Sequence, residues 1–130
     1  GLTGVPVSFT GQQLYSPQTL ATTAGGNAQV STCGVGGFGY TSEAPNFSVN
    51  LTGMEGYGRL EIEGVSGCDT TLLVRTPDGR FHYDDDSNGN LLPLLNLSSS
   101  AMLNGRLDIW VGTFGGNTCP ASIELETWLN

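Results

Sequence analysis

Glycines and prolines break this 130-residue sequence into short pieces, and this punctuation is its strongest constraint on the fold. Twenty glycines and six prolines make up a fifth of the chain. Between the breaks, apolar and polar residues alternate with a period of two, as in the run Phe47–Leu51. No window of eleven residues carries the i, i+3, i+4, i+7 apolar stripe of a helix. The pattern therefore predicts an all-β protein of short strands and tight turns.

Eight or nine short strands of this kind predict an antiparallel β-sandwich or barrel, and 130 residues are enough for one domain. The sequence Pro77-Asp78-Gly79 suits a tight turn, because proline fixes φ at the first central position and glycine accepts a positive φ near the end. We therefore expect a hairpin between strands at 70–76 and 80–84. Residues 91–97 contain Pro93 and are expected to be extended or irregular.

The first 26 residues are expected to form an N-terminal arm or edge strand, and residues 27–130 the β-sandwich domain. Apolar residues alternate only at Val5, Val7 and Phe9, and Gly25-Gly26 offers a joint. A segment this short does not bury its apolar face alone. It must dock on its own sandwich or on the open sheet edge of another copy, and the sequence leaves both alternatives open.

The charge balance excludes several classes of partner. Twelve acidic residues face four arginines and no lysine, which gives a formal net charge of −8. Binding to nucleic acid or to an anionic membrane surface needs Lys and Arg that this chain lacks. No apolar run approaches the ~20 residues of a membrane-spanning helix. Charged residues are only 12% of the chain, which favours a secreted protein. No charged leader followed by an apolar stretch is present, so we expect that any signal peptide has been removed.

Three cysteines, Cys33, Cys68 and Cys119, allow three different single disulfides. An exported chain would use one of them and leave one cysteine over. The sequence has no C-x-x-C motif and one histidine, which argues against a structural zinc site.

Two segments resemble the bacterial pre-peptidase C-terminal (PPC) domain family. They are CDTTLLVRTPDGRFHYDDDS at residues 68–87 and GRLDIWVGTF at residues 105–114. Upstream, Cys33, Gly39-Tyr40, Ala44-Pro45 and Phe47 are similar to one exported subgroup. The similarity covers roughly residues 28–128. It implies a β-sandwich of jelly-roll type, export, frequent attachment to secreted enzymes and, in some members, calcium or polymer binding.

The chain departs from this family in two respects. No peptidase accompanies it, so it resembles an exported stand-alone member. The subgroup often has a cysteine just before the acidic loop, where this chain has Tyr83, which leaves Cys33 free or re-paired. We predict a Cys68–Cys119 disulfide, with each cysteine just before a strand, and Cys33 unpaired or joined to another molecule.

A calcium site is predicted at the acidic segment 84–90. Asp84, Asp85 and Asp86 are adjacent carboxylates that repel one another unless a cation or solvent lies between them. Calcium takes six to eight oxygen ligands, and Asp69 and Asp108 would complete the set from neighbouring strands. The alternative is a solvated acidic turn whose aspartates accept hydrogen bonds from their own backbone.

An exposed platform that stacks on sugar rings could include five aromatic residues, Trp110, Tyr83, Phe81, Tyr57 and Trp128, of which Trp110 and Tyr83 are the chosen candidates. In the predicted strand 107–111, Trp110 shares a face with Asp108, opposite the three apolar residues. The alternative is that Trp110 packs under a loop or against the N-terminal arm.

No catalytic constellation stands out, and we predict that the protein is not an enzyme. His82 lies two residues before Asp84, but no G-x-S-x-G motif marks a nucleophile. Glu61 and Glu63 lie on one strand face, whereas glycosidase pairs normally come from different elements across a cleft.

These observations predict a non-catalytic, secreted, calcium-stabilised β-sandwich protein with a structural role, which assembles with copies of itself into an extracellular filament or matrix. The alternative function is an extracellular polysaccharide-binding module.

Overall fold

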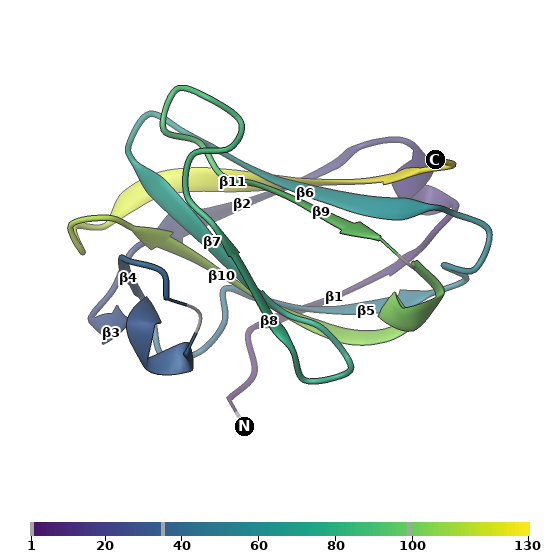
Figure 1. Cartoon of the computed structure of the whole chain (residues 1–130), viewed down its shortest axis with the longest axis horizontal. Coiled ribbons are helices and arrows are strands. Elements are labelled where there is room, and N and C mark those ends of the chain that lie inside the picture. Colours follow the sequence, from purple (N-terminus) through teal and green to yellow (C-terminus); the bar gives the residue numbers. More distant parts are fainter. Residues whose placement is uncertain (1, 35, 99) are drawn as a thin grey trace.

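Two β-sheets pack face to face and form a sandwich, as the sequence pattern predicted (Figure 1). The structure is a computed structural model, and it describes residues 2–34, 36–98 and 100–130. The strands are β1 (Val5–Thr10), β2 (Gln18–Ala24), β3 (Ala28–Gln29), β4 (Tyr40–Thr41), β5 (Phe47–Thr52), β6 (Arg59–Ser66), β7 (Thr70–Arg75), β8 (Phe81–Asp84), β9 (Leu94–Ser98), β10 (Gly105–Thr113) and β11 (Cys119–Trp128). Short 3-10 helices are η1 (Gln13–Tyr15), η2 (Val30–Cys33) and η3 (Ser100–Leu103). No helix among the described residues is long and apolar enough to cross a membrane.

One sheet, which we call sheet A, is built around β10. Strands β5 and β4 pair along one edge of β10, with β1 beyond β5 and β3 beyond β4, while β7 and then β8 lie along the other edge. Sheet B has the order β2-β11-β6-β9. The described residues thus form eleven strands, more than the eight or nine expected, since the two-residue strands β3 and β4 are too short to show a period of two.

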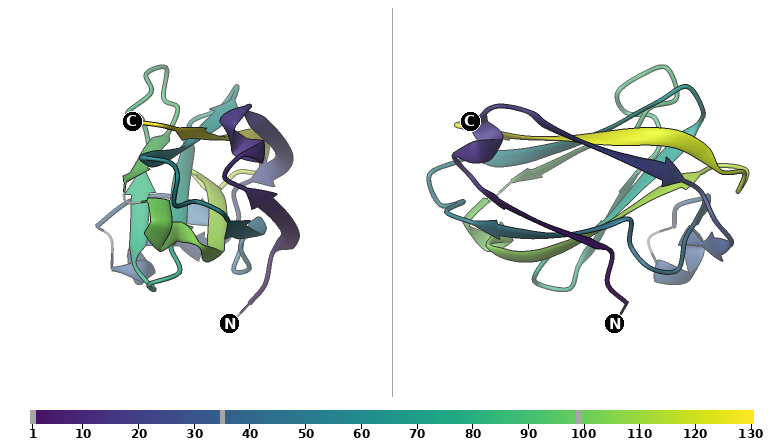
Figure 2. Two further views of the ribbon diagram at one scale, coloured as in Figure 1. Left: turned by 90° about the vertical axis from the view of Figure 1, so that its right-hand side faces the viewer. Right: turned by 180° about the vertical axis from the view of Figure 1, so that it is seen from behind.

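The expected antiparallel pairing holds throughout except between β1 and β5, which are parallel. The chain leaves β1 through η1 and enters β2 in the other sheet, so no hairpin fixes the direction of β1. β1 and β2 form one edge of each sheet and lie on the same side of the sandwich, seen in purple in Figure 2. Leu14 and Ala24, from this N-terminal segment, are fully buried in the core.

The core lies between the two sheets and follows the alternation of their strands. In β10, Leu107, Ile109 and Val111 are fully buried, and in β11 Ile123 and Leu125 are fully buried. The alternate residues of both strands point outward. Consequently, the outer faces of the two sheets carry the side chains that are available for function.

The Pro77-Asp78-Gly79 turn joins β7 to β8 in the expected hairpin, in which Arg75 pairs with Phe81. Gly79 has φ +85°, a conformation that favours glycine, and its N–H donates to the Thr76 carbonyl at 2.9 Å. Residues 91–97 were expected to be extended or irregular, and residues 94–97 lie in β9, which begins at Leu94 after Pro93.

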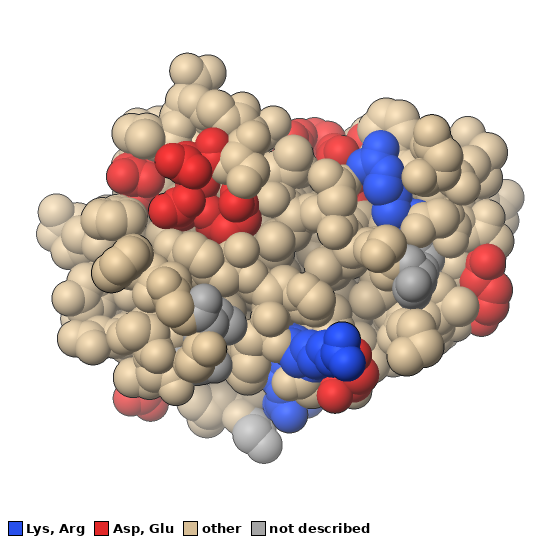
Figure 3. Space-filling view, viewed as in Figure 1, with Lys and Arg blue, Asp and Glu red and all other residues tan. Residues whose placement is uncertain are grey.

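Charged side chains are unevenly spread over the surface (Figure 3). Acidic residues gather beside β7 and the β8–β9 loop, at the upper left of the view. An arginine and an acidic side chain adjoin near the turn between β7 and β8, at the lower centre. Arg80 and Asp78 form an ion pair at 3.6 Å.

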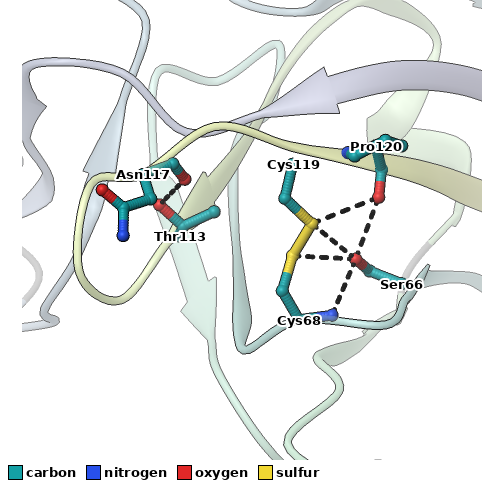
Figure 4. The surroundings of a disulfide bond; sticks show 6 residues. All are labelled: Ser66, Cys68, Thr113, Asn117, Cys119 and Pro120. Atoms are coloured by element: carbon teal, nitrogen blue, oxygen red, sulfur yellow. Dashed lines mark hydrogen bonds between the residues drawn. A yellow bond between two sulfur atoms is a disulfide. The ribbon is translucent and has the colours of Figure 1, made fainter.

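A disulfide joins Cys68 to Cys119, as predicted (Figure 4). It links the turn where the chain crosses from β6 to β7 with the first residue of β11. The Ser66 hydroxyl lies 3.1 and 3.2 Å from the two sulfur atoms and donates to the Pro120 carbonyl at 3.1 Å. Cys33 is left out of this bridge, and its side chain lies outside the described part of the structure.

Replacing both bridged cysteines, as Cys68→Ser/Cys119→Ser, should lower stability. The bridge spans 51 residues of sequence, and loop-closure entropy gives about 4 kcal/mol for a loop of this length. Chemical denaturation would measure the loss, with Cys33→Ser as the matched control that keeps the bridge. Peptide mapping that finds Cys33 joined to either partner would contradict the assignment.

Candidate functional site

The outer face of sheet A carries the residues that could bind a ligand. Strand register on this sheet places β8, β7 and β10 side by side, so their outward side chains form rows across the strands. The two rows are Phe81–Arg75–Asp108 and Tyr83–Leu73–Trp110.

A groove runs over these rows beside Trp110 and Phe81; we call it the Trp110 groove. It contains a hollow of about 410 Å³ that is lined by Leu2, Arg75, Phe81, Arg106, Asp108 and Trp110, among others. A second hollow of about 200 Å³ shares Glu43, Phe81 and Trp110 with the first. The two rings therefore lie where the hollows meet.

The aromatic rings of the groove have a defined arrangement. The centroids of Phe81 and Trp110 lie 6.1 Å apart with the ring planes tilted by 42°. The Arg75 guanidinium lies over the Phe81 ring at 5.9 Å. The Trp110 indole N–H donates to the Glu43 carbonyl at 3.1 Å, which fixes one edge of the indole. Trp110 thus faces away from the core, as the alternation predicted, and is half-buried against the 42–46 segment.

One charged pair of the groove, Asp108 with Arg106, is tied to the sheet by hydrogen bonds. The Asp108 carboxylate accepts hydrogen bonds from the Ser48 hydroxyl at 2.8 Å and from Arg106 Nε at 2.9 Å. A second Arg106 nitrogen donates to the Leu2 carbonyl at 2.9 Å. Asp108 is buried, so its carboxylate serves to orient Arg106 and to hold the N-terminal segment beside the groove.

Tyr83, the second predicted ligand-binding residue, is engaged by a loop. Its hydroxyl donates to the Phe38 carbonyl at 2.8 Å and accepts from the Phe38 N–H at 3.2 Å. A Cβ added to Gly37 would lie 2.7 Å from the Tyr83 ring, so glycine is needed there for the close approach. Burial, together with the nearby Asp85 and Asp84, raises the pKa of Tyr83. The structure therefore brings Phe81 rather than Tyr83 to Trp110.

Phe81 was among the five candidate aromatic residues, but the sequence did not predict its pairing with Trp110, because that pairing depends on strand register. The sequence predicted the hairpin, but it did not predict that β7 lies between β8 and β10. The usable signal was the alternation of Phe81 with His82 on the second strand of the hairpin.

The predicted calcium ligands fall into separate groups. The pKa of Tyr83 is raised first by burial and then by the charges of Asp85, Asp84 and Asp69. Asp108 and Asp84 lie on opposite sides of β7. Asp108 is on β10 opposite Arg75, whereas Asp84 is on β8 opposite Leu72. The Asp108 carboxylate pairs with Arg106 at 2.9 Å, and its role as a calcium ligand stays a prediction.

Asp84 itself closes the acidic loop. Its two carboxylate oxygens accept hydrogen bonds from the Ser87 N–H at 3.0 Å, from the Ser87 hydroxyl and from the Leu94 N–H at 2.8 Å. Burial, followed by contact with Asp86 and repulsion from both neighbours, raises the pKa of Asp85. Among the described residues, no group of three or more Asp, Glu, His or Cys side chains is arranged to hold a metal ion.

The single histidine is not arranged for triad chemistry. His82 Nε2 lies 3.4 Å from the Thr76 hydroxyl. The Asp78 carboxylate accepts a hydrogen bond from Thr76 rather than from the imidazole. A general base in a triad needs a carboxylate that orients it, and in this arrangement Asp78 orients the hydroxyl instead.

Four glutamates share the outer face of sheet B, where register sets them opposite one another in the pairs Glu61–Glu126 and Glu63–Glu124. Burial, followed by repulsion from Glu124, raises the pKa of Glu63. Burial, followed by repulsion from Glu61, raises the pKa of Glu126. These carboxylates lie on one sheet face and not across a cleft as in a glycosidase pair.

Comparison with known proteins supports the fold. No protein-family model matches the sequence, and no curated protein is similar to it. Among solved structures, the pre-peptidase C-terminal domain of a collagenase from Bacillus anthracis is 9% identical, with a TM-score of 0.52 over 98% of both chains. A periplasmic inhibitor of g-type lysozyme from Aeromonas hydrophila, PliG, is 15% identical, with a TM-score of 0.50 over 97% of this chain and 96% of that one. At these identities the likeness shows the fold alone, and it agrees with the β-sandwich that the PPC resemblance implied.

Calcium binding stays a prediction, with Asp69, Asp84, Asp85, Asp86 and Asp108 as its ligands. If calcium binds there, millimolar calcium added to EDTA-treated protein should raise the Tm. The free energy of unfolding should rise by about 2.7 kcal/mol at a hundredfold excess of calcium over Kd. The double variant Asp85→Asn/Asp86→Asn should abolish that gain. An equal Tm in EDTA and in calcium would identify the segment as an acidic turn that Asp84 closes without metal.

Proposed function

We propose that this protein is a non-catalytic, exported β-sandwich module that binds an extracellular saccharide in the Trp110 groove. The observation that supports the proposal is the Phe81–Trp110 ring pair at the junction of two hollows, with arginines beside it. This was the alternative function that the sequence indicated.

The composition of the groove suits a sugar ring. Aromatic faces pack against the apolar face of a pyranose, and polar groups at the edge of the site fix its orientation through hydroxyl groups. The larger hollow, of about 410 Å³, falls within the range of roughly 300–1,000 Å³ of small-molecule sites. Arg75 and Arg106 supply hydrogen-bond donors along its edge.

Two observations support export. A disulfide such as Cys68–Cys119 persists in oxidising compartments and is rare in the cytosol. One of the structural neighbours is a periplasmic protein, and the other is a domain of a collagenase.

Trp110→Ala should abolish saccharide binding and leave the fold intact, because the indole faces outward from β10. The matched control is Trp128→Ala, which removes the protein's other tryptophan, 36% exposed on sheet B and outside the groove. Retention on a panel of immobilised polysaccharides would compare the two variants. Equal retention of both variants and of the wild type would place binding elsewhere on the surface.

Self-assembly is a second candidate function, and the edges of the sandwich favour it. Residues 1–42 contain no charged side chain, and this stretch supplies both β1 and β2. Proteins commonly guard such edges with charged residues, above all lysine, against pairing with another chain. β1 contains Pro6, which interrupts pairing, whereas β2 contains no proline and is the more open edge.

Ala21→Lys should convert an assembling protein into a monomer. Ala21 is exposed on β2, and a charge there opposes the approach of a second strand. Light scattering after size-exclusion chromatography would measure the mass over a range of concentrations. A wild-type protein that stays monomeric at the highest concentration would rule out assembly through this edge.

A further inference from the structure

Three of the four arginines are paired with a neighbouring carboxylate. Arg59 lies 3.3 Å from Glu61, and the other two pairs are Arg80–Asp78 at 3.6 Å and Arg106–Asp108 at 2.9 Å. Arg75 has no such partner within 4.0 Å in the part of the chain that the structure describes. In a protein with twelve acidic residues, an arginine without a carboxylate is the exception that needs a reason.

The neighbours of Arg75 explain how it stays unpaired. Asp108 is directly opposite on β10, but its carboxylate is buried and engaged by Ser48 and Arg106. On the other side, Phe81 is opposite on β8, and the Arg75 guanidinium lies over its ring at 5.9 Å. The ring limits the positions open to the guanidinium and leaves its N–H groups free to donate into the groove.

The distribution of charge favours this groove over the rest of the surface for an anionic ligand. Its lining includes two of the four arginines, Arg75 and Arg106, and two of the twelve acidic residues, Glu43 and Asp108. The whole formal charge of −8 therefore lies outside the groove. The outer face of sheet B carries four opposed glutamates, and three adjacent aspartates lie at the end of β8 and the start of the β8–β9 loop.

We propose that the Trp110 groove binds an acidic saccharide, a uronate, whose carboxylate is held by Arg75 while the sugar ring packs on Trp110. The inference rests on the proposed saccharide binding and names its ligand class. A planar guanidinium donates two parallel hydrogen bonds to a carboxylate, which an ammonium group does not do. The aromatic rings alone would accept neutral and acidic sugars equally, so Arg75 is the residue that selects acidic sugars over neutral ones.

The test compares each ligand with its own uncharged form. Polygalacturonate, alginate and hyaluronan are presented in native form and after reduction of their carboxyl groups to primary alcohols. Wild-type protein should bind at least one native polymer tenfold or more tightly than its reduced form. Arg75→Gln should weaken binding to the native polymer about tenfold or more and leave binding to the reduced form unchanged, as expected for loss of a charge-assisted bidentate pair.

Two further variants separate this inference from the proposed function. Arg80→Gln makes the same charge change outside the groove, on an arginine already paired with Asp78, and should bind native polymer like the wild type. Trp110→Ala should lose both forms. Equal binding of native and reduced polymers by wild type, or an Arg75→Gln variant that matches wild type on native polymer, would overturn the uronate inference and leave saccharide binding standing. Failure of wild type to bind any polymer in either form would overturn both.

Discussion

The pairing of β10 with β5 on one edge and β7 on the other is the interaction on which both the core and the candidate site depend. Five residues of β10 pair with β5, and six pair with β7. Because side chains alternate, this single strand puts Leu107, Ile109 and Val111 into the core and Asp108 and Trp110 on the outer face. A slip by one residue would exchange the two sets, so the apolar core also fixes the orientation of the groove.

Asn46 extends this dependence to the other sheet. Its side-chain oxygen accepts from the Val111 N–H at 2.8 Å, and its amide nitrogen donates to Thr22 and Thr23 on β2, each at 3.0 Å. One side chain therefore links the middle of sheet A to an edge strand of sheet B. The 42–46 segment, which ends at this clamp, also provides the carbonyl of Glu43 that holds the Trp110 indole. The groove is thus built against a segment that the sandwich itself immobilises.

Local signals in the sequence predicted the side-chain orientations and turns that depend on adjacent residues. They did not predict the contacts that depend on strand register. Alternation placed Trp110 outward, and Pro77-Asp78-Gly79 predicted the β7–β8 hairpin; both are properties of a few adjacent residues. The arrangement of Phe81, Arg75 and Trp110 needed the order β8-β7-β10, which is decided by packing of the whole core. Asp108 shows the same limit, since its pairing with Arg106 depends on its position between Ser48 and the N-terminal segment, which local spacing does not reveal.

The two candidate functions use different parts of the sandwich, and this separation has a physical basis. Binding would use the Trp110 groove on the outer face of sheet A, where two arginines balance two acidic residues, whereas assembly through β2 would use backbone groups at the edge of sheet B. The outer face of sheet B is not suited to either role, because opposed glutamates repel anionic ligands and would repel the same face of a second copy. Any contact between copies would therefore favour the uncharged edges. A polymer joined there would leave the Trp110 groove of every copy open, so that assembly would multiply ligand sites along a filament and raise avidity without any change in the groove.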